Sequence, residues 1–216
     1  NHTGYLEIST LIEAYSNYLK SLNSFSNEGF NYTEIEFLDN GIQYKNIQAK
    51  HIIFAEGFGL HANPYFNDLP LDGTKGELLI IKAPNLDLDV VIKSSVFILP
   101  IGNDMYKVGA TYDWKDKTNI PTEEGKQELV EKLKEIISCD FEIVEHFGGV
   151  RPTVKDRRPL VGTHPDYSQL HILNGLGTRG VMLGPYLANQ LFQYIENKIP
   201  LEKEIDIIRC YKKNRN

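Results

Sequence analysis

Cysteine, methionine and tryptophan are scarce in this sequence of 216 residues, which has two, two and one of them respectively. Cys139 and Cys210 lie far apart and form no Cys-x-x-Cys pair, which argues against a disulfide framework and against a zinc site. No apolar run approaches the roughly 20 residues that a membrane-spanning helix needs. We therefore expect a cytoplasmic protein that has no membrane span and binds no metal.

Positive charge is also in short supply, because 23 Lys and Arg residues face 29 Asp and Glu residues, for a formal net charge of -6. This acidic balance disfavours a phosphate-backbone partner such as a nucleic acid. Hydrophobic residues make up 41% of the chain and aromatic residues 11%. This content is typical of a globular protein with a packed core, in one or two domains.

The pattern of apolar residues predicts an α+β fold with a largely antiparallel sheet. Helices are expected over 10–22, with Ser9 as N-cap, and over 122–138. Asp39-Asn40-Gly41 is a hairpin turn signal. Strands are expected over 76–82, 90–99, 105–112 and 141–150. Turns and no helix separate the first three strands, which favours antiparallel pairing.

Two further expected strands run directly into glycine-containing turns. Residues 50–55 lead into Glu56-Gly57, and residues 170–173 lead into the segment 175–180, which reads Gly-Leu-Gly-Thr-Arg-Gly. The second turn is expected to begin a helix whose inward side chains are Val181, Leu187, Leu191 and Ile195.

The second turn matches the Gly-x-Gly-x-x-Gly pattern of dinucleotide-binding folds, but only one helix and one weak apolar run follow it. Such a junction bares N–H groups at the positive end of a helix dipole, where they can face a negative or electron-rich group. We expect the turn near Gly180 to use the positive φ angles that glycine tolerates. The alternative interpretation is a tight corner without a ligand.

Three segments, in chain order, resemble the D-amino-acid oxidase and glycine oxidase family of FAD-dependent enzymes. They are Lys50–Gly59 (KHIIFAEGFG), Gly148–Gly162 (GGVRPTVKDRRPLVG) and His171–Pro185 (HILNGLGTRGVMLGP). Gly73–Lys82 also fits the start of the family's substrate-domain sheet. The resemblance covers nearly the whole chain. It implies a C-terminal portion that lacks the family's N-terminal, ADP-binding βαβ unit.

The family folds as two interleaved domains. The resemblance assigns residues 1–59 and 148–216 to a partial FAD-binding domain, and residues 60–147 to a substrate-binding domain. It also implies FAD that is bound non-covalently, because the Arg-Pro segment contains no cysteine. Without the ADP-binding unit, these residues alone are expected to bind FAD weakly or not at all.

Two substrate-binding residues follow from the resemblance. Arg151 corresponds to the arginine that clamps the substrate carboxylate, for which a guanidinium fork is well suited; the alternative is a structural ion pair, for instance with Asp156. Phe97 occupies a strand position that is Tyr in D-amino-acid oxidase and glycine oxidase, and Phe cannot donate that hydrogen bond; the alternative is core packing. No side chain is assigned a catalytic role, because the flavin does the chemistry.

The resemblance also implies the residues that contact the cofactor. Gly57 is expected to lie close to it, since a Cβ there would crowd the approach, and the alternative is an ordinary turn. Backbone N–H groups of the second glycine turn are expected near the flavin pyrimidine. The full set is Gly57, Gly175, Gly177, Thr178, Arg179, Gly180, Val181 and Met182.

The implied function is oxidation of a C–N bond in an amine or amino-acid-like small molecule, by hydride transfer to FAD. Two alternatives stay open. Gly177-Thr178-Arg179-Gly180 is closer to the flavin domain of bacterial tRNA wobble-uridine-modifying enzymes, and a basic surface around Lys155, Arg157 and Arg158 would favour that function. The other alternative is a folded but catalytically silent fragment that cannot hold FAD.

Overall fold

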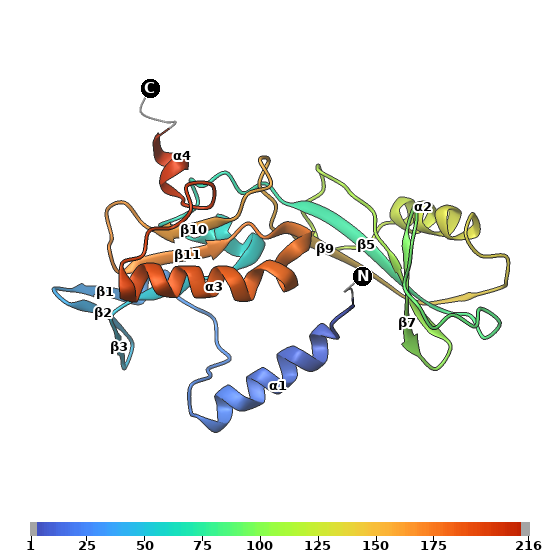
Figure 1. The fold of residues 1–216 in the computed structure, drawn as a ribbon, viewed down its shortest axis with the longest axis horizontal. Coiled ribbons are helices and arrows are strands. Elements are labelled where there is room, and N and C mark those ends of the chain that lie inside the picture. The colour runs from blue at the N-terminus through green and yellow to red at the C-terminus, as the bar shows by residue number, and fades with distance from the viewer. Residues whose placement is uncertain (1–3, 213–216) are drawn as a thin grey trace.

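The computed structural model describes residues 4–212, which form two lobes joined by two long neighbouring strands, β5 and β9 (Figure 1). Helices and antiparallel sheets are mixed in both lobes, so the expected α+β class is confirmed. Among the described residues, no helix is long and apolar enough to cross a membrane.

The first lobe is a five-stranded antiparallel sheet in the order β6-β7-β8-β5-β9. Its strands are β5 (Thr74–Lys82), β6 (Ile92–Lys93), β7 (Phe97–Gly102), β8 (Met105–Gly109) and β9 (Glu142–Arg151). The strand expected over 90–99 is divided into β6 and β7, because the Ser94 N–H bonds to the Val96 carbonyl and turns the chain. The strand expected over 105–112 ends at Gly109.

One face of this sheet is covered by α2 (Glu123–Lys134). The Thr122 side chain accepts a hydrogen bond from the Gly125 N–H, which caps the helix. Alternate residues of β5, Leu79 and Ile81, pack on this face with Leu129 and Leu133 of the helix. The opposite face of the sheet carries no helix (Figure 1).

The second lobe contains a three-stranded sheet in the order β10-β11-β4. Strand β4 (Ile52–Phe54) runs parallel to β11 (Leu170–Asn174), and β10 (Leu160–Thr163) runs antiparallel to it. Helix α3 (Gly180–Asn197) packs on Val161 through Leu187, Leu191 and Ile195, as expected. Val181 was expected to point inward, but it is 47% exposed. It lies in the first turn of α3, six residues before Leu187, the first helix residue that is buried in this core.

A small sheet of β1 (Ile35–Leu38), β2 (Gly41–Tyr44) and β3 (Ile47–Ala49) borders this lobe, and the turn at 39–40 joins β1 to β2 as expected. Short helical turns η1 (Tyr32–Glu34), η2 (Gly57–Ala62) and η3 (Gly177–Arg179) and helix α4 (Ile208–Lys212) complete the described elements.

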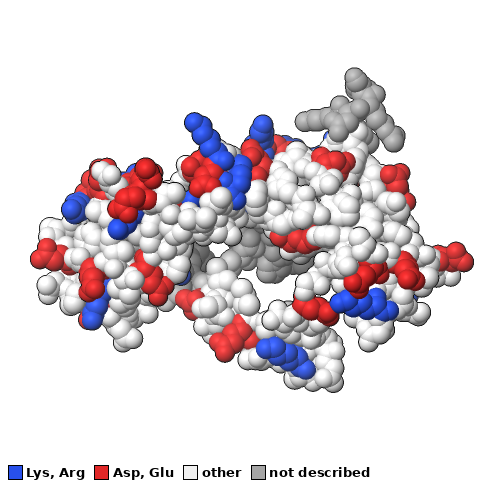
Figure 2. Space-filling view, turned by 180° about the vertical axis from the view of Figure 1, so that it is seen from behind, with Lys and Arg blue, Asp and Glu red and all other residues white. Residues whose placement is uncertain are grey.

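Helix α1 (Ile8–Ser21) has no buried residue. Its N-cap is Glu7, whose carboxylate accepts hydrogen bonds from the N–H and hydroxyl of Ser9, and not Ser9 itself. The apolar side chains Leu11, Ile12 and Tyr15 are all exposed. The helix stands away from both lobes (Figures 1 and 2), so its apolar face has no partner among the described residues.

Two histidines meet beside the parallel pair of strands. In β11, His171 Nε2 lies 2.9 Å from His51 Nδ1, and His171 Nδ1 lies 2.8 Å from Thr163 Oγ1. Burial lowers the pKa of His171 to about 4, with smaller contributions from the neighbouring His51 and Lys198. The folded state therefore holds His171 neutral.

This histidine predicts acid sensitivity of the fold. Because the folded pKa lies below the usual value of 6.5, its contribution to stability is complete above about pH 6.5 and is lost as the pH falls towards 4. A shift of this size corresponds to roughly 3 kcal/mol. The free energy of unfolding, measured with urea at a series of pH values, should fall less between pH 6.5 and 4 in His171→Gln than in the unmodified protein. The control His61→Gln, at an exposed histidine, should show the full fall. Equal pH dependence in His171→Gln would contradict this prediction.

Candidate functional site

The three glycine-bearing motifs converge between the lobes. The Gly177 N–H donates to the Pro152 carbonyl at 2.9 Å. Asn174, buried at the end of β11, donates from Nδ2 to the Gly57 carbonyl at 2.9 Å and accepts from the Gly175 N–H at 2.8 Å. Asn174 was missed from sequence, where its only signal is a polar residue closing a buried strand. It links the two glycine turns directly.

Two of the glycines in the second turn require a conformation that other residues avoid. Gly175 has φ +71° and Gly177 has φ +56°, whereas Gly180 has φ −55°. The positive φ angles expected of the turn thus occur at Gly175 and Gly177 and not at Gly180, which is already the first residue of α3 and has helical geometry. A Cβ on Gly180 would meet nothing closer than Leu176 Cβ at 3.8 Å, so this position is open.

Helix α3 begins without a side-chain cap, because the Arg179 side chain makes no capping hydrogen bond. The first-turn N–H groups have no intrahelical partner and lie at the positive end of the helix dipole. Thr178, Val181 and Met182 surround this end, with Met182 69% exposed. The Arg179 guanidinium is directed elsewhere, donating from Nη2 to the Arg157 carbonyl at 2.8 Å.

A cavity of about 670 Å³ lies where the two lobes meet. Thr74, Tyr112 and Trp114 line it from the five-stranded-sheet side, and the segment 175–179 lines it from the other side, with Thr153 between them. Thr74 Oγ1 and Thr153 Oγ1 are hydrogen-bonded at 2.9 Å. The sheet, the Arg-Pro segment and the glycine turn therefore share one cavity.

Arg151 ends β9 and lies across the open face of the sheet. Its guanidinium occupies the space above Gly76, where an added Cβ would come within 2.0 Å of Nη2. The Tyr112 ring stacks on it, 4.6 Å from Cζ to the ring centroid, and Nη1 lies 3.4 Å from the Thr111 carbonyl oxygen. Burial lowers the pKa of this guanidinium.

Arg151 forms no ion pair within residues 4–212. The alternative partner named from sequence, Asp156, lies 3.7 Å from Arg209 instead. A half-buried cation that has no carboxylate partner among residues 4–212 is available to an anionic ligand.

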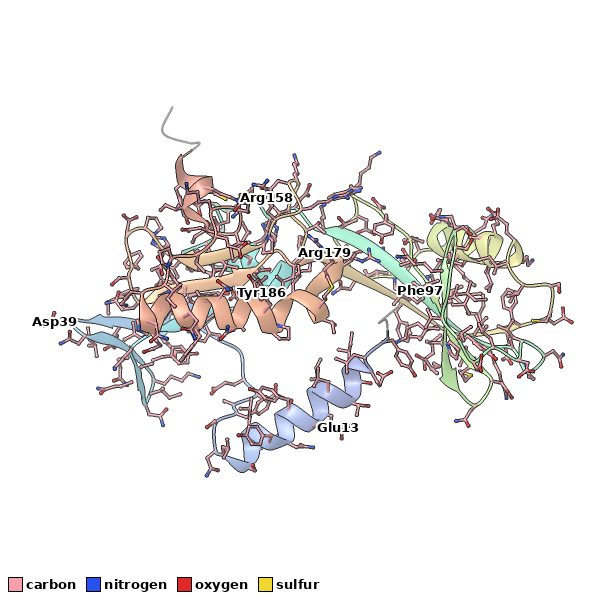
Figure 3. The ribbon with its side chains drawn as sticks, viewed as in Figure 1. Glu13, Asp39, Phe97, Arg158, Arg179 and Tyr186 are labelled. Carbon is pink, nitrogen blue, oxygen red and sulfur yellow. The ribbon has the colours of Figure 1, made fainter. Side chains whose placement is uncertain are left out.

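Phe97 shares this face of the sheet with Arg151. Strand register aligns Phe97, Gly109, Leu78 and Phe147 in one row across β7, β8, β5 and β9. Paired residues of antiparallel strands point to the same side, so the three side chains form an apolar row. Two residues along β5 on the same face, Gly76 pairs with Gly149, and after two more residues Thr74 pairs with Arg151. Figure 3 shows Phe97 on this sheet.

Lysines that were missed from sequence hold the loop that carries Tyr112 and Trp114. The buried Lys75 Nζ lies 2.5 Å from Asp116 Oδ2 and 3.2 Å from Glu77 Oε1. Lys117 Nζ bonds to Asp72 Oδ1 at 2.8 Å and to the Trp114 carbonyl at 2.7 Å. Lysine is common on surfaces, so nothing in the sequence marked these two as anchors.

The contact between Gly76 and Arg151 gives a direct prediction. Gly76→Ala would displace the guanidinium, because a methyl group takes its place. The affinity of the Gly76→Ala variant for a small carboxylate, measured by NMR titration, should be about tenfold or more lower, the equivalent of about 1.4 kcal/mol. The control is Gly29→Ala, at an exposed glycine outside the site where a Cβ meets nothing within 4 Å. Unchanged affinity in Gly76→Ala would mean that the guanidinium does not bind carboxylates.

Comparison with known proteins identifies the class. The family model for FAD-dependent oxidoreductases of the DAO type matches residues 28–193. The chain is 28% identical over 184 residues to the tRNA 5-methylaminomethyl-2-thiouridine biosynthesis bifunctional protein MnmC of Marinobacter nauticus, covering 75% of this chain and 29% of that protein. It is 25% identical over 160 residues to glycine oxidase of Bacillus subtilis, covering 71% and 43%.

Solved structures agree. Iminodiacetate oxidase from a Chelativorans species superposes with a TM-score of 0.66 at 23% identity, over 80% of this chain and 51% of that one. L-Proline dehydrogenase from P. horikoshii gives 0.68 at 14% identity, over 81% and 51%. The chain thus belongs to the DAO family of FAD-dependent oxidoreductases. It spans about half the length of these structures, and less of the two sequence relatives.

Gly57 and the first turn of α3 do not line the 670 Å³ cavity, but their geometry fits an FAD ring system. The uncapped start of α3 offers N–H donors, and the Cβ directions of Gly57 and Gly180 are open, with the nearest atoms at 4.0 and 3.8 Å. Gly57 thus leaves room beside Pro152, as a close approach requires.

Proposed function

We propose that this protein oxidises the C–N bond next to the carboxylate of an amino-acid-like small molecule, with FAD as the hydride acceptor. The observation that carries the proposal is the Arg151 guanidinium, which has no acidic partner among the described residues and stacks on Tyr112, a residue that lines the same cavity as the glycine turn. The names of relatives support it, since glycine oxidase, iminodiacetate oxidase and L-proline dehydrogenase all act on amino acids or close analogues.

In this proposal each residue has a definite task. Arg151 binds the carboxylate through its fork, and Tyr112 keeps the guanidinium plane in place. Phe97 contributes apolar surface and no hydrogen bond. The N–H groups at 178–182 hold negative charge at the pyrimidine edge of the flavin. Bound FAD supplies the hydride acceptor, held non-covalently because the segment 148–185 contains no cysteine.

We further propose that residues 1–216 alone hold FAD weakly and are then catalytically silent. Within the described residues β4 pairs only with β11, and α1 exposes its whole apolar face. Both are surfaces on which a unit holding the ADP half of FAD could pack. We also propose that residues 1–59 and 148–216 form the FAD-binding domain, that residues 60–147 form the substrate-binding domain, and that the protein is cytoplasmic.

The carboxylate clamp predicts the effect of a conservative substitution. In the flavin-loaded enzyme, Arg151→Lys should raise KM for a carboxylate substrate and lower kcat/KM by more than an order of magnitude, because lysine keeps the charge but loses the fork. Arg158→Lys, at an exposed arginine, is the matched control. If steady-state kinetics give the same kcat/KM for Arg151→Lys as for the unmodified enzyme, Arg151 does not bind the substrate.

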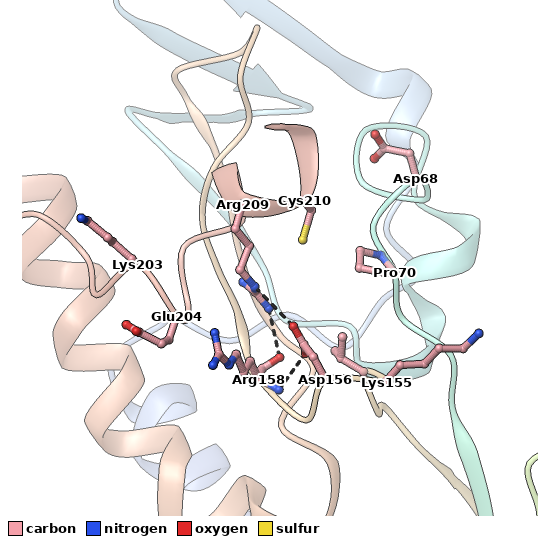
Figure 4. A pocket seen from close by; sticks show the side chains of 10 residues that line it. Asp68, Pro70, Lys155, Asp156, Arg158, Lys203, Glu204, Arg209 and Cys210 are labelled. Atoms are coloured by element: carbon pink, nitrogen blue, oxygen red, sulfur yellow. Dashed lines mark hydrogen bonds and ion pairs between the residues drawn. The ribbon is translucent and has the colours of Figure 1, made fainter. Parts of the chain in front are cut away.

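A tRNA substrate is the second candidate, favoured by the exposed loop 155–158. Lys155, Arg157 and Arg158 form no ion pair among the described residues. Lys155 and Arg158 line a cavity of about 460 Å³ in which Arg209 contacts Asp156 and the carbonyls of Arg158 and Pro159 (Figure 4), whereas Arg157 lines the 670 Å³ cavity. Figure 2 shows Lys and Arg side chains rising at the top of the molecule beside acidic ones.

This candidate predicts salt-dependent tRNA binding through that loop. Replacing Lys155, Arg157 and Arg158 with Ala together should weaken tRNA binding about tenfold or more, and should reduce the slope of log affinity against log salt by roughly 2 to 3. The control removes three charges from α2 through Lys126→Ala, Lys132→Ala and Lys134→Ala. Fluorescence anisotropy showing the same affinity and slope for both triple variants would exclude the loop as a tRNA contact.

A further inference from the structure

The open face of the five-stranded sheet holds a cavity of about 320 Å³ beside Arg151. Arg151 is the one charged residue that lines it; the other lining residues are Gly76, Leu78, Phe147, Gly148, Gly149 and Val150. The cavity therefore has a cationic end and no second polar side chain along the rest of its wall.

The two ends of this cavity are separated by one row of glycines. The guanidinium lies above Gly76, and Leu78, the next residue on this face, is about 7 Å further along β5. Leu78 and Phe97 approach each other above Gly109, and Phe147 pairs with Leu78 from β9 while remaining 42% exposed. Above Gly149 the space is empty, since an added Cβ would meet nothing within 4 Å.

From this arrangement we propose that the substrate carries one carboxylate and an apolar side chain or N-substituent, which lies over Gly149 against Leu78 and Phe147. This inference rests on the proposed function and specifies its substrate class. Glycine would leave the apolar row uncovered. A dicarboxylate would bring its second charge against apolar surface, where no second cation lines the cavity.

The test uses the chain itself and three probes, so that it does not depend on flavin loading. Acetate, succinate and phenylacetate are titrated into the protein, and dissociation constants are measured from NMR shifts. Phenylacetate should bind at least tenfold more tightly than acetate, because its ring removes apolar surface from water. Succinate should bind no more tightly than acetate, because its second carboxylate would lie against apolar surface.

Variants locate the two ends of the ligand. Arg151→Gln should abolish binding of all three probes. Gly149→Leu fills the space above the sheet and should reduce phenylacetate affinity to the level of acetate. Its control is Gly29→Leu, an exposed glycine where a Cβ also meets nothing within 4 Å. Melting temperatures confirm that each variant is folded, and the comparison of probes on the unmodified chain does not need any variant.

The outcomes separate this inference from the function beneath it. Equal affinities for acetate and phenylacetate, both lost in Arg151→Gln, would overturn the apolar substrate class and leave the carboxylate clamp standing. Tighter binding of succinate than of phenylacetate would do the same. Probe binding that is absent, or that survives in Arg151→Gln, would overturn both the clamp and the substrate class.

Discussion

The candidate site depends on one steric relation, the guanidinium of Arg151 lying directly above the Cα of Gly76. A side chain at that position would push the cation off the sheet, and a side chain at Gly149 would fill the neighbouring space. Two paired glycines inside neighbouring strands are otherwise unfavourable, because glycine weakens strands. Their presence is explained if the face above them must stay open for a ligand.

The alternation of β5 lets one strand serve both the site and the fold. Thr74, Gly76 and Leu78 face the open side, while Lys75, Glu77 and Leu79 face α2. On the buried side, Glu77 Oε2 lies 2.8 Å from His146 Nε2, and Glu77 accepts hydrogen bonds from the N–H and hydroxyl of Thr122. The polar network behind the sheet thus fixes the strand, the helix cap and the loop that holds Tyr112 over Arg151.

Much of the architecture could be predicted from the sequence, because apolar period and turn chemistry are local signals. The hairpin at Asp39–Asn40, helix α2 and the strand entering Gly175 followed from such signals. The break at Ser94 did not, since two serines within an apolar run resemble a continuous strand. The exposure of Val181 could not be predicted either, because the apolar pattern does not show where along α3 the packing on the sheet begins.

The site was accessible from sequence only through motifs. Arg151 and the glycine turns stand in recognisable segments, whereas Gly76, Asn174 and Tyr112 acquire their positions from strand register and loop anchoring. Register depends on pairing between β5 and β9, which are about 60 to 80 residues apart in the chain, and local pattern carries little information about such pairing.

The most direct test of this account is a crystal structure of the flavin-loaded protein with a bound carboxylate inhibitor. We predict the inhibitor carboxylate on the Arg151 guanidinium, its apolar part above Gly149, and the flavin pyrimidine edge at the N–H groups of residues 178–182. A structure with the carboxylate bound elsewhere, or with Arg151 paired to an acidic side chain of the protein, would contradict it.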